Sequence, residues 1–315
     1  MSGLIVRTVR GDLNPALLGL TLSHEHLYAV PPPDASEPDL MIDDLGVMAR
    51  ELTLFRAAGG GTVVEMTTPD YGRDGRRLLE LSRRSGVHIV AATGYNKARF
   101  AERLTAGRSV QELSAHFVRE VTQGLSECAG QTPSVRAGVI KASSSLNGPS
   151  AAEQAVFMAA AAAHRVTHAP ISTHTEKGTW AQGQLDLLST QGVPPARVLV
   201  GHLDLNPDLP ALLEVAARGA YLGLDQFGKA KYLPDARRAE LVCELFSAGY
   251  GAQVLLSGDM ARRSSFAGWG GPGLTHLPGE GRRLLRALGL SDEQVAQLLI
   301  DNPRRFFSFS PGGGS

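Results

Sequence analysis

Short apolar, β-branched runs alternate with longer segments of helical periodicity along almost the whole chain. Eight runs have the length and composition of buried strands: Thr21–His24, Thr62–Met66, His88–Thr93, Val135–Lys141, Ile171–His174, Val198–His202, Ala220–Asp225 and Val254–Asp259. Helices are predicted between them at Leu45–Ala58, Gly75–Ser85, Val110–Cys128, Ala151–Val166, Trp180–Gln191, Pro210–Arg218 and Arg237–Ala248. Strands that alternate with helices predict a parallel sheet.

Eight strand–helix units favour a closed (β/α)8 TIM barrel. The alternative is an open doubly wound sheet, which usually has a glycine-rich phosphate turn after its first strand; His24-Glu25-His26 stands there instead. No change in composition divides the chain, so we expect one domain over residues 1–310 and a flexible tail over residues 311–315. Near the C-terminus, Ser291 and Asn302 are predicted to begin helices as caps.

Composition narrows the choice of partners and compartment. Apolar residues make up 43% of the chain, charged residues make up 20%, and the formal net charge is zero. A nucleic-acid partner is not expected, because such proteins usually carry a basic excess. The two cysteines, Cys128 and Cys243, form no CxxC pattern, and no signal peptide or membrane span is evident. A cytoplasmic protein without a membrane partner is therefore expected.

The C-terminal ends of the predicted strands carry polar residues, and in a (β/α)8 barrel the active site lies at that face. These residues are His24, His26, Lys141, His174, His202 and Asp259. Residues two apart on a strand point the same way, so His24 and His26 are expected to face one metal. Imidazole and carboxylate ligands suit zinc and its neighbours. The histidines on or near predicted helices, and His88 at the start of a strand, are interpreted as structural.

Lys141 ends a predicted buried strand and allows three interpretations. An ammonium group has no lone pair and cannot bind a metal. If CO2 carboxylates the amine, the resulting carbamate has two oxygens that can bridge two ions. A structural salt bridge and a Schiff-base lysine are the alternatives. The nearby histidines favour the carbamate.

Taken together, these residues resemble the phosphotriesterase family of the amidohydrolase superfamily from Val9 to about Phe307. The motifs that carry the resemblance are Leu22-Ser23-His24-Glu25-His26, Gly138-Val139-Ile140-Lys141, Thr173-His174-Thr175, Gly201-His202-Leu203-Asp204, Ser257-Gly258-Asp259 and Asn302-Pro303. The His-x-His motif occurs in many amidohydrolases, whereas the full set of strand-end residues is much more specific.

The resemblance implies a binuclear metal-dependent hydrolase. One ion would lie between His24, His26 and Asp259, and the other between His174 and His202. Carboxylated Lys141 and a hydroxide would bridge the ions, the hydroxide would be the nucleophile, and Asp259 would carry the proton to the leaving group. The expected metal is zinc, with manganese or cobalt as alternatives. The family resemblance also implies a possible homodimer.

Two departures argue against acyl-homoserine lactones as substrates. Lactonases of this family that act on them resemble one another in a tyrosine after strand 3 and an arginine after the strand 7 aspartate. This chain has Asn96 and Gln226 at those positions.

Basic residues in the loops after strands 7 and 8 point to a phosphorylated substrate instead. Loops at these places often bind phosphate in (β/α)8 barrels, and here they contain Lys229, Lys231, Arg262 and Arg263. They resemble the branch that hydrolyses phosphorylated sugar lactones, in which residues matching Lys231 and Arg262 bind the phosphate. That branch tends to have a tyrosine where Ser265 stands. A solvated basic loop face is the structural alternative.

The leading hypothesis is thus a lactonase for a sugar lactone, in particular a phosphorylated sugar 1,4-lactone. A close alternative is a lactonase for unphosphorylated or alkyl lactones with weak organophosphate hydrolysis. A non-catalytic sugar-phosphate sensor and a Schiff-base aldolase that uses Lys141 belong to different functional classes.

Overall fold

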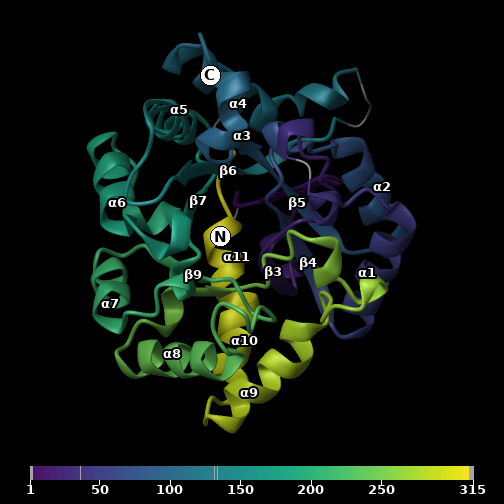
Figure 1. Cartoon of the computed structure of the whole chain (residues 1–315), viewed down its shortest axis with the longest axis vertical. Coiled ribbons are helices and arrows are strands. Elements are labelled where there is room, and N and C mark those ends of the chain that lie inside the picture. Colours follow the sequence, from purple (N-terminus) through teal and green to yellow (C-terminus); the bar gives the residue numbers. More distant parts are fainter. Residues whose placement is uncertain (1–2, 36, 131, 133, 312–315) are drawn as a thin grey trace.

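The computed structural model describes residues 3–35, 37–130, 132 and 134–311 and has a ring of eight parallel strands at its centre (Figure 1). Each strand pairs with the next along the chain. The strands are β3 (Leu20–Glu25), β4 (Gly60–Glu65), β5 (His88–Gly94), β6 (Ala137–Ser144), β7 (Ile171–Thr175), β8 (Val198–Gly201), β9 (Tyr221–Leu224) and β10 (Val254–Leu256). An N-terminal hairpin of β1 (Val6–Thr8) and β2 (Gly11–Leu13) precedes them. The predicted (β/α)8 barrel is confirmed.

Individual hydrogen bonds, and not a continuous ladder, join β10 to β3 in the described chain. The Ser23 hydroxyl donates to the Leu256 carbonyl at 2.9 Å, and the Asp259 amide donates to the His24 carbonyl at 3.1 Å. The Ser257 hydroxyl accepts from the His24 amide at 3.0 Å. Closure of the barrel therefore depends on side chains and loop residues next to the predicted metal ligands.

Helices surround the strands, and several begin with side-chain caps. Ser109, Ser150 and Ser291 form capping boxes, as the sequence predicts for Ser291. The helices are α1 (Leu45–Ala57), α2 (Gly75–Ser85), α3 (Ala98–Thr105), α4 (Val110–Thr122), α5 (Ala151–Thr167), α6 (Ala181–Thr190), α7 (Leu209–Ala217), α8 (Asp235–Ser247), α9 (Arg282–Ala287), α10 (Asp292–Ala296) and α11 (Asn302–Phe307).

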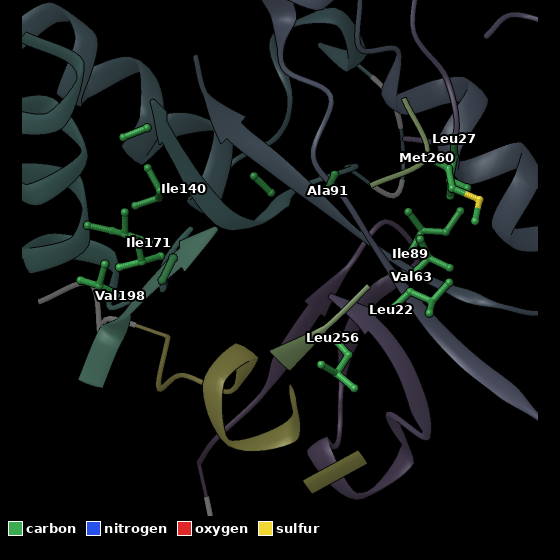
Figure 2. Packing of buried hydrophobic residues seen from close by; sticks show 14 of the residues in the cluster. Leu22, Leu27, Val63, Ile89, Ala91, Ile140, Ile171, Val198, Leu256 and Met260 are labelled. Atoms are coloured by element: carbon green, nitrogen blue, oxygen red, sulfur yellow. The ribbon is translucent and has the colours of Figure 1, made fainter. Parts of the chain in front are cut away.

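Buried apolar side chains form two layers, one on each face of the strands. The outer layer joins strands to helices and includes Leu22, Val63 and Ile89 (Figure 2). The inner layer fills the barrel with residues such as Val64, Val90, Val139, Leu199 and Leu255, and Leu18, Phe306 and Phe307 pack against it. α11 lies over the centre of the ring in Figure 1. Apolar packing therefore closes the end of the barrel where the strands begin, and polar residues occupy the other end.

Several predicted strand boundaries were wrong at the site. β6 continues to Ser144, so Lys141 lies inside the strand and not at its end. β8 ends directly before His202, whose φ angle of +60° a strand cannot accommodate, and β10 ends at Leu256, so that Asp259, with φ +44°, lies in the following turn.

Helical predictions differed in three places. The helix expected over 110–128 ends at Thr122, since Gly124 has φ +152°, and a separate 3-10 turn covers Ser126–Cys128. α3 was not predicted. Asn302 is no cap: it lies in a continuous helix and its buried amide donates to the Gly251 and Val254 carbonyls at 2.8 Å.

Of the predicted tail, Pro311 is exposed, and residues 312–315 lie outside the described residues. The described helices include none that combines the length and the apolar character needed to cross a bilayer.

Candidate metal centre

The barrel brings all of the predicted metal ligands to one small cavity of about 120 Å³ at the carboxyl ends of the strands. Its lining includes His24, His26, Lys141, His174, His202 and Asp259. His24, His26 and Asp259 offer ligand atoms that all lie within 4.8 Å of one another. The proximity of these six side chains agrees with the sequence prediction, and their assignment as metal ligands stays a prediction.

β3 has a register shift next to the two histidines. Leu22 pairs with Val63 and Glu25 pairs with Glu65, so three steps along β3 match two steps along β4. The extra residue changes the alternation of side chains. His24 lies within this irregular stretch and His26 follows the end of the strand, and both line the cavity, as the prediction from their two-residue spacing expected.

His24 has the chemistry of an incomplete metal ligand. Its side chain is buried, and neither ring nitrogen has a hydrogen-bond partner among the described residues. Burial, together with the charge of Lys141, lowers the pKa of His24 well below its usual value. A neutral buried imidazole has one ring nitrogen with a free lone pair, which fits a divalent cation, whereas a structural histidine is normally hydrogen-bonded.

His26 and Asp259 face each other, with His26 Nε2 3.3 Å from Asp259 Oδ1. Thr67 Oγ1 lies 2.8 Å from His26 Nδ1 and so fixes the ring with Nε2 toward the cavity. Burial lowers the pKa of His26. Hydrogen bonding of one ring nitrogen is the usual way in which proteins orient a metal-binding histidine.

Asp259 presents its two carboxylate oxygens to different partners. Oδ1 faces the histidines, while Oδ2 accepts from Gln226 Nε2 at 2.9 Å and from Lys229 Nζ at 2.7 Å. Burial alone would raise the pKa of Asp259, but the charge of Lys229, the hydrogen bond with His26 and the charges of His202 and His24 together hold the pKa well below its usual range. Asp259 is therefore ionised, with one oxygen free to bind a cation.

His174 and His202 form the opposite wall of the cavity. Their ring centroids are 4.5 Å apart, and burial lowers the pKa of His174 to about 3. His202 Nδ1 lies 2.7 Å from Asp225 Oδ1, which leaves Nε2 for another partner. Burial would lower the pKa of His202, yet the Asp225 carboxylate outweighs burial and raises it. This carboxylate keeps the ring oriented in the way that metal-binding histidines usually are.

The sequence argument gave no role to Asp225. It is fully buried, and its oxygens lie within 4.8 Å of ligand atoms of His24 and His202. The strand-end rule that selected the histidines applies equally to Asp225. Gln226 was likewise given no role in the site, and Lys229 was grouped with the basic loop residues expected near a phosphate, whereas its Nζ donates to Asp259; both contacts span about thirty positions of sequence.

Lys141 is only 2% exposed, and its Nζ donates to the Met66 carbonyl at 3.0 Å. No carboxylate of the described chain lies within 4.0 Å of this nitrogen, which argues against the structural salt bridge. Burial lowers the pKa of Lys141 and favours the neutral amine. The neutral amine is the form that adds to CO2 or to a carbonyl carbon.

A second cavity of about 460 Å³ adjoins the first, sharing His174, His202 and Asp259 with it. Loops after β9 and β10 line it with Lys231 and Arg262, which the sequence predicted to bind substrate. Lys231 Nζ lies 4.8 Å from the centre of the Tyr232 ring. Arg262 Nη1 is already 2.6 Å from Glu37 Oε2 and 3.6 Å from Asp39 Oδ2.

Residues 4–307 match the model of the phosphotriesterase family. A relative from Escherichia coli (strain K12), the phosphotriesterase homology protein, is 36% identical over 290 residues, which cover 92% of this chain and 98% of the relative. The phospho-furanose lactonase of Mycoplasmopsis synoviae (strain 53) is 29% identical over 98% of this chain and 93% of its own length.

Solved structures share the fold over nearly the whole chain. The lactonase Lmo2620 from Listeria monocytogenes has a TM-score of 0.89 at 32% identity and covers 96% of this chain and 98% of its own. The Escherichia coli phosphotriesterase homology protein, complexed with phosphate in its active site, has a TM-score of 0.88 at 36% identity and 92% and 99% coverage. Organophosphorus hydrolase from Deinococcus radiodurans has a TM-score of 0.84 at 32% identity and 96% coverage of both chains.

Proposed function

The chain belongs to the phosphotriesterase family and is a metal-dependent hydrolase, and we propose that it opens a sugar lactone, in particular a phosphorylated sugar 1,4-lactone. One observation carries the proposal: a cavity lined by candidate metal ligands opens into a larger one lined by Lys231 and Arg262. Relatives named phospho-furanose lactonase, and the phosphate in the active site of the Escherichia coli relative, support it.

The donor set suits two divalent ions, with zinc as the first choice and manganese or cobalt as alternatives. His24, His26 and Asp259 would hold one ion, and His174 and His202 would hold the other. When bound, such ions polarise a carbonyl oxygen and lower the pKa of the attacking water.

Lys141 is proposed to join the two halves of the ligand set as a carbamate. The neutral Nζ would attack the carbon of CO2, form a C–N bond and release one proton to water. The product carries a negative charge on two oxygens, in place of an ammonium group that would repel cations. The buried position and the lowered pKa of Lys141 support this step.

Asp259 is proposed to move the proton during ring opening. Its carboxylate would take a proton from the attacking water and return it to the ring oxygen as the C–O bond breaks. Gln226 and Lys229 hold Oδ2 from one side, so the carboxylate keeps its orientation while it exchanges the proton. His202 keeps its own orientation through Asp225.

Lys231 and Arg262 are proposed to bind the phosphate at the outer end of the substrate. A phosphate offers charge-assisted hydrogen bonds to both side chains. Arg262 forms an ion pair with Glu37 at 2.6 Å. To bind a phosphate, its guanidinium group must either leave Glu37 or contact both groups at once.

A second candidate is a lactonase for unphosphorylated or alkyl lactones with weak organophosphate hydrolysis. The ion pair between Arg262 and Glu37 favours it, since it reduces the positive charge available to a phosphate. The Deinococcus radiodurans relative named organophosphorus hydrolase, 32% identical, also supports it.

Steady-state kinetics on one sugar lactone with and without its phosphate tests the choice. For the phosphorylated lactone, Lys231→Ala and Arg262→Ala should each raise KM by about tenfold to a hundredfold, because a charge-assisted hydrogen bond contributes roughly 1.5–3 kcal/mol. For the unphosphorylated lactone, KM should not change. Equal effects on both substrates, or none on either, would favour the second candidate.

The same preparations separate the remaining hypotheses. No turnover of any lactone or ester by zinc-loaded protein would indicate a sensor. A borohydride-trapped adduct on Lys141 would indicate a Schiff-base aldolase, and a Lys141→Ala variant is the control for that adduct.

A further inference from the structure

We propose that Glu25, the middle residue of His24-Glu25-His26, is the positioning residue that fixes Asp259 at the metal centre. The inference rests on the proposed function, in which Asp259 is both a ligand and the proton carrier. Glu25 ends the first strand of the barrel and Asp259 follows the last strand, and the barrel closes where they meet. The motif would thereby supply two ligands and also determine the place of a third.

The Glu25 carboxylate binds the chain on both sides of Asp259. Oε1 accepts from the Ser257 hydroxyl and from the Gly258 amide, each at 2.7 Å. Oε2 accepts from the Met260 amide at 2.8 Å. The carboxylate is fully buried, so water does not compete with these three donors.

Asp259 needs such support because its backbone is strained. Its φ of +44° lies in the left-handed region, which a residue with a side chain seldom adopts unless its surroundings impose it. β10 has ended at Leu256, so no strand pairing holds this turn. The Asp259 amide itself donates to the His24 carbonyl at 3.1 Å. Residues of β3 therefore hold the turn at Asp259 and on both sides of it.

The packing around Gly258 shows how closely the carboxylate approaches this turn. A Cβ atom on Gly258 would lie 3.2 Å from Glu25 Oε1, 3.2 Å from the Phe227 carbonyl oxygen and 3.1 Å from Met260 Cε. Contacts of that length are tighter than ordinary van der Waals contact. A side chain at position 258 would therefore press on the Glu25 carboxylate.

A carboxylate suits this position better than an amide. All three groups that face Glu25 are donors, and a carboxylate offers only acceptors. In Glu25→Gln, one side-chain NH2 group would face a backbone N–H or the Ser257 hydroxyl. At least one buried hydrogen bond would be lost, and the turn that carries Asp259 would move.

Metal binding by the full-length Glu25→Gln variant tests the proposal without any substrate. In equilibrium dialysis against zinc, we expect the wild-type protein to hold two ions. In the variant, the more weakly bound of the two ions should have an affinity about 10- to 100-fold lower than in the wild type, which is the usual effect of removing a group that orients a metal ligand. In cobalt-loaded protein, the visible absorption band of the variant should differ from that of the wild type, since the band reports ligand geometry.

Glu120→Gln is the matched control, because Glu120 is also a fully buried glutamate of the same barrel and lies in a separate cluster with Arg73. It should lower the melting temperature but leave zinc content per folded chain and the cobalt band unchanged. Should Glu25→Gln fail to fold, Glu25→Asp keeps the carboxyl group on a shorter side chain, and we expect it to weaken zinc binding in the same way.

The outcomes separate this inference from the proposed function. Two tightly bound ions and a wild-type cobalt band in Glu25→Gln would overturn the role of Glu25 and leave the hydrolase intact. A wild-type protein that binds no metal would overturn both. Equal losses of metal in Glu25→Gln and Glu120→Gln would reduce Glu25 to a general stabilising role and so overturn the proposal as well.

Discussion

Two clusters of buried ionisable side chains lie in this barrel, one around Arg73 and one around His24. The central side chain of the first makes all the hydrogen bonds it can, and the central side chain of the second makes none among the described residues. Arg73 makes five hydrogen bonds, to Glu120, to Glu127 and to the Ala92 carbonyl, which is the full number that a guanidinium can donate. At the metal centre, His24 is just as buried, and neither of its ring nitrogens has a hydrogen-bond partner in the described chain, with Asp225 and Asp259 oxygens at 3.5 and 3.7 Å.

The difference separates a group that stabilises the fold from one that serves function. A buried polar group without a partner costs stability, and folded proteins rarely keep one unless a ligand completes it. Every donor of the Arg73 guanidinium is satisfied within the described chain. The nitrogen and oxygen atoms around His24 lack a shared partner among the residues that the structure describes. A divalent cation would be such a partner, because it is positively charged and accepts several ligand atoms at once. Substitutions in the two clusters should therefore have contrasting effects.

The largest expected effect follows from His24→Ala. Turnover should fall by at least about a thousandfold, as expected when a group that organises the reacting centre is removed. In metal-free protein, the free energy of unfolding should change by less than about 1 kcal/mol, because the side chain makes no hydrogen bond and faces a cavity. Kinetics and chemical denaturation measure the two quantities. Wild-type turnover, or severe destabilisation without metal, would remove the contrast.

Arg73→Met should have the opposite effects. The free energy of unfolding should fall by about 3–5 kcal/mol, because Glu120 would be left buried without its counter-charge. Zinc content and turnover per folded chain should stay at the wild-type level. Urea denaturation and metal analysis of the same sample check both, and loss of metal would show that the two clusters are coupled.

Acid should weaken the Arg73 cluster through Glu120. Burial alone would raise the pKa of Glu120, but the charge and hydrogen bonds of Arg73, helped by His116 and the Ser126 amide, together lower it from 4.5 to about 2. Since the folded state has the lower pKa, the ion pair contributes stability above pH 4.5 and loses it as the pH falls toward 2. The loss should be roughly 3 kcal/mol. Denaturation curves across this range should show it, and Glu120→Gln should largely remove it.

The smallest expected effect concerns the outer cavity. Glu37→Gln would remove the nearer of the two carboxylates beside Arg262, so inorganic phosphate and a phosphorylated lactone should bind more tightly. The gain should be about twofold to fivefold, because exposed ion pairs contribute roughly 0.2–1 kcal/mol. Inhibition of turnover by inorganic phosphate measures it. Asp43→Asn, which frees the neighbouring Arg263, is the matched control and should leave the inhibition unchanged.

Much of this barrel was predictable because its signals are local. Apolar runs of strand length fix the eight strands, and the rule that strand ends carry the site selected the six residues around the small cavity. Other features depend on contacts distant in sequence. The ion pair of Glu37 with Arg262 and the bonds of Glu25 to the turn at Asp259 each span more than two hundred residues. The register shift in β3 and the left-handed backbone of His202 and Asp259 leave no pattern in the sequence either.

Metal content of protein purified without chelator tests the central claim most directly. The account predicts about two divalent ions per chain in wild-type protein, and the loss of both metal and turnover in Lys141→Ala. After a chelator has removed the metal from wild-type protein, zinc added with bicarbonate should restore metal content and turnover. No bound metal, and no turnover after addition of zinc, manganese or cobalt with bicarbonate, would contradict it.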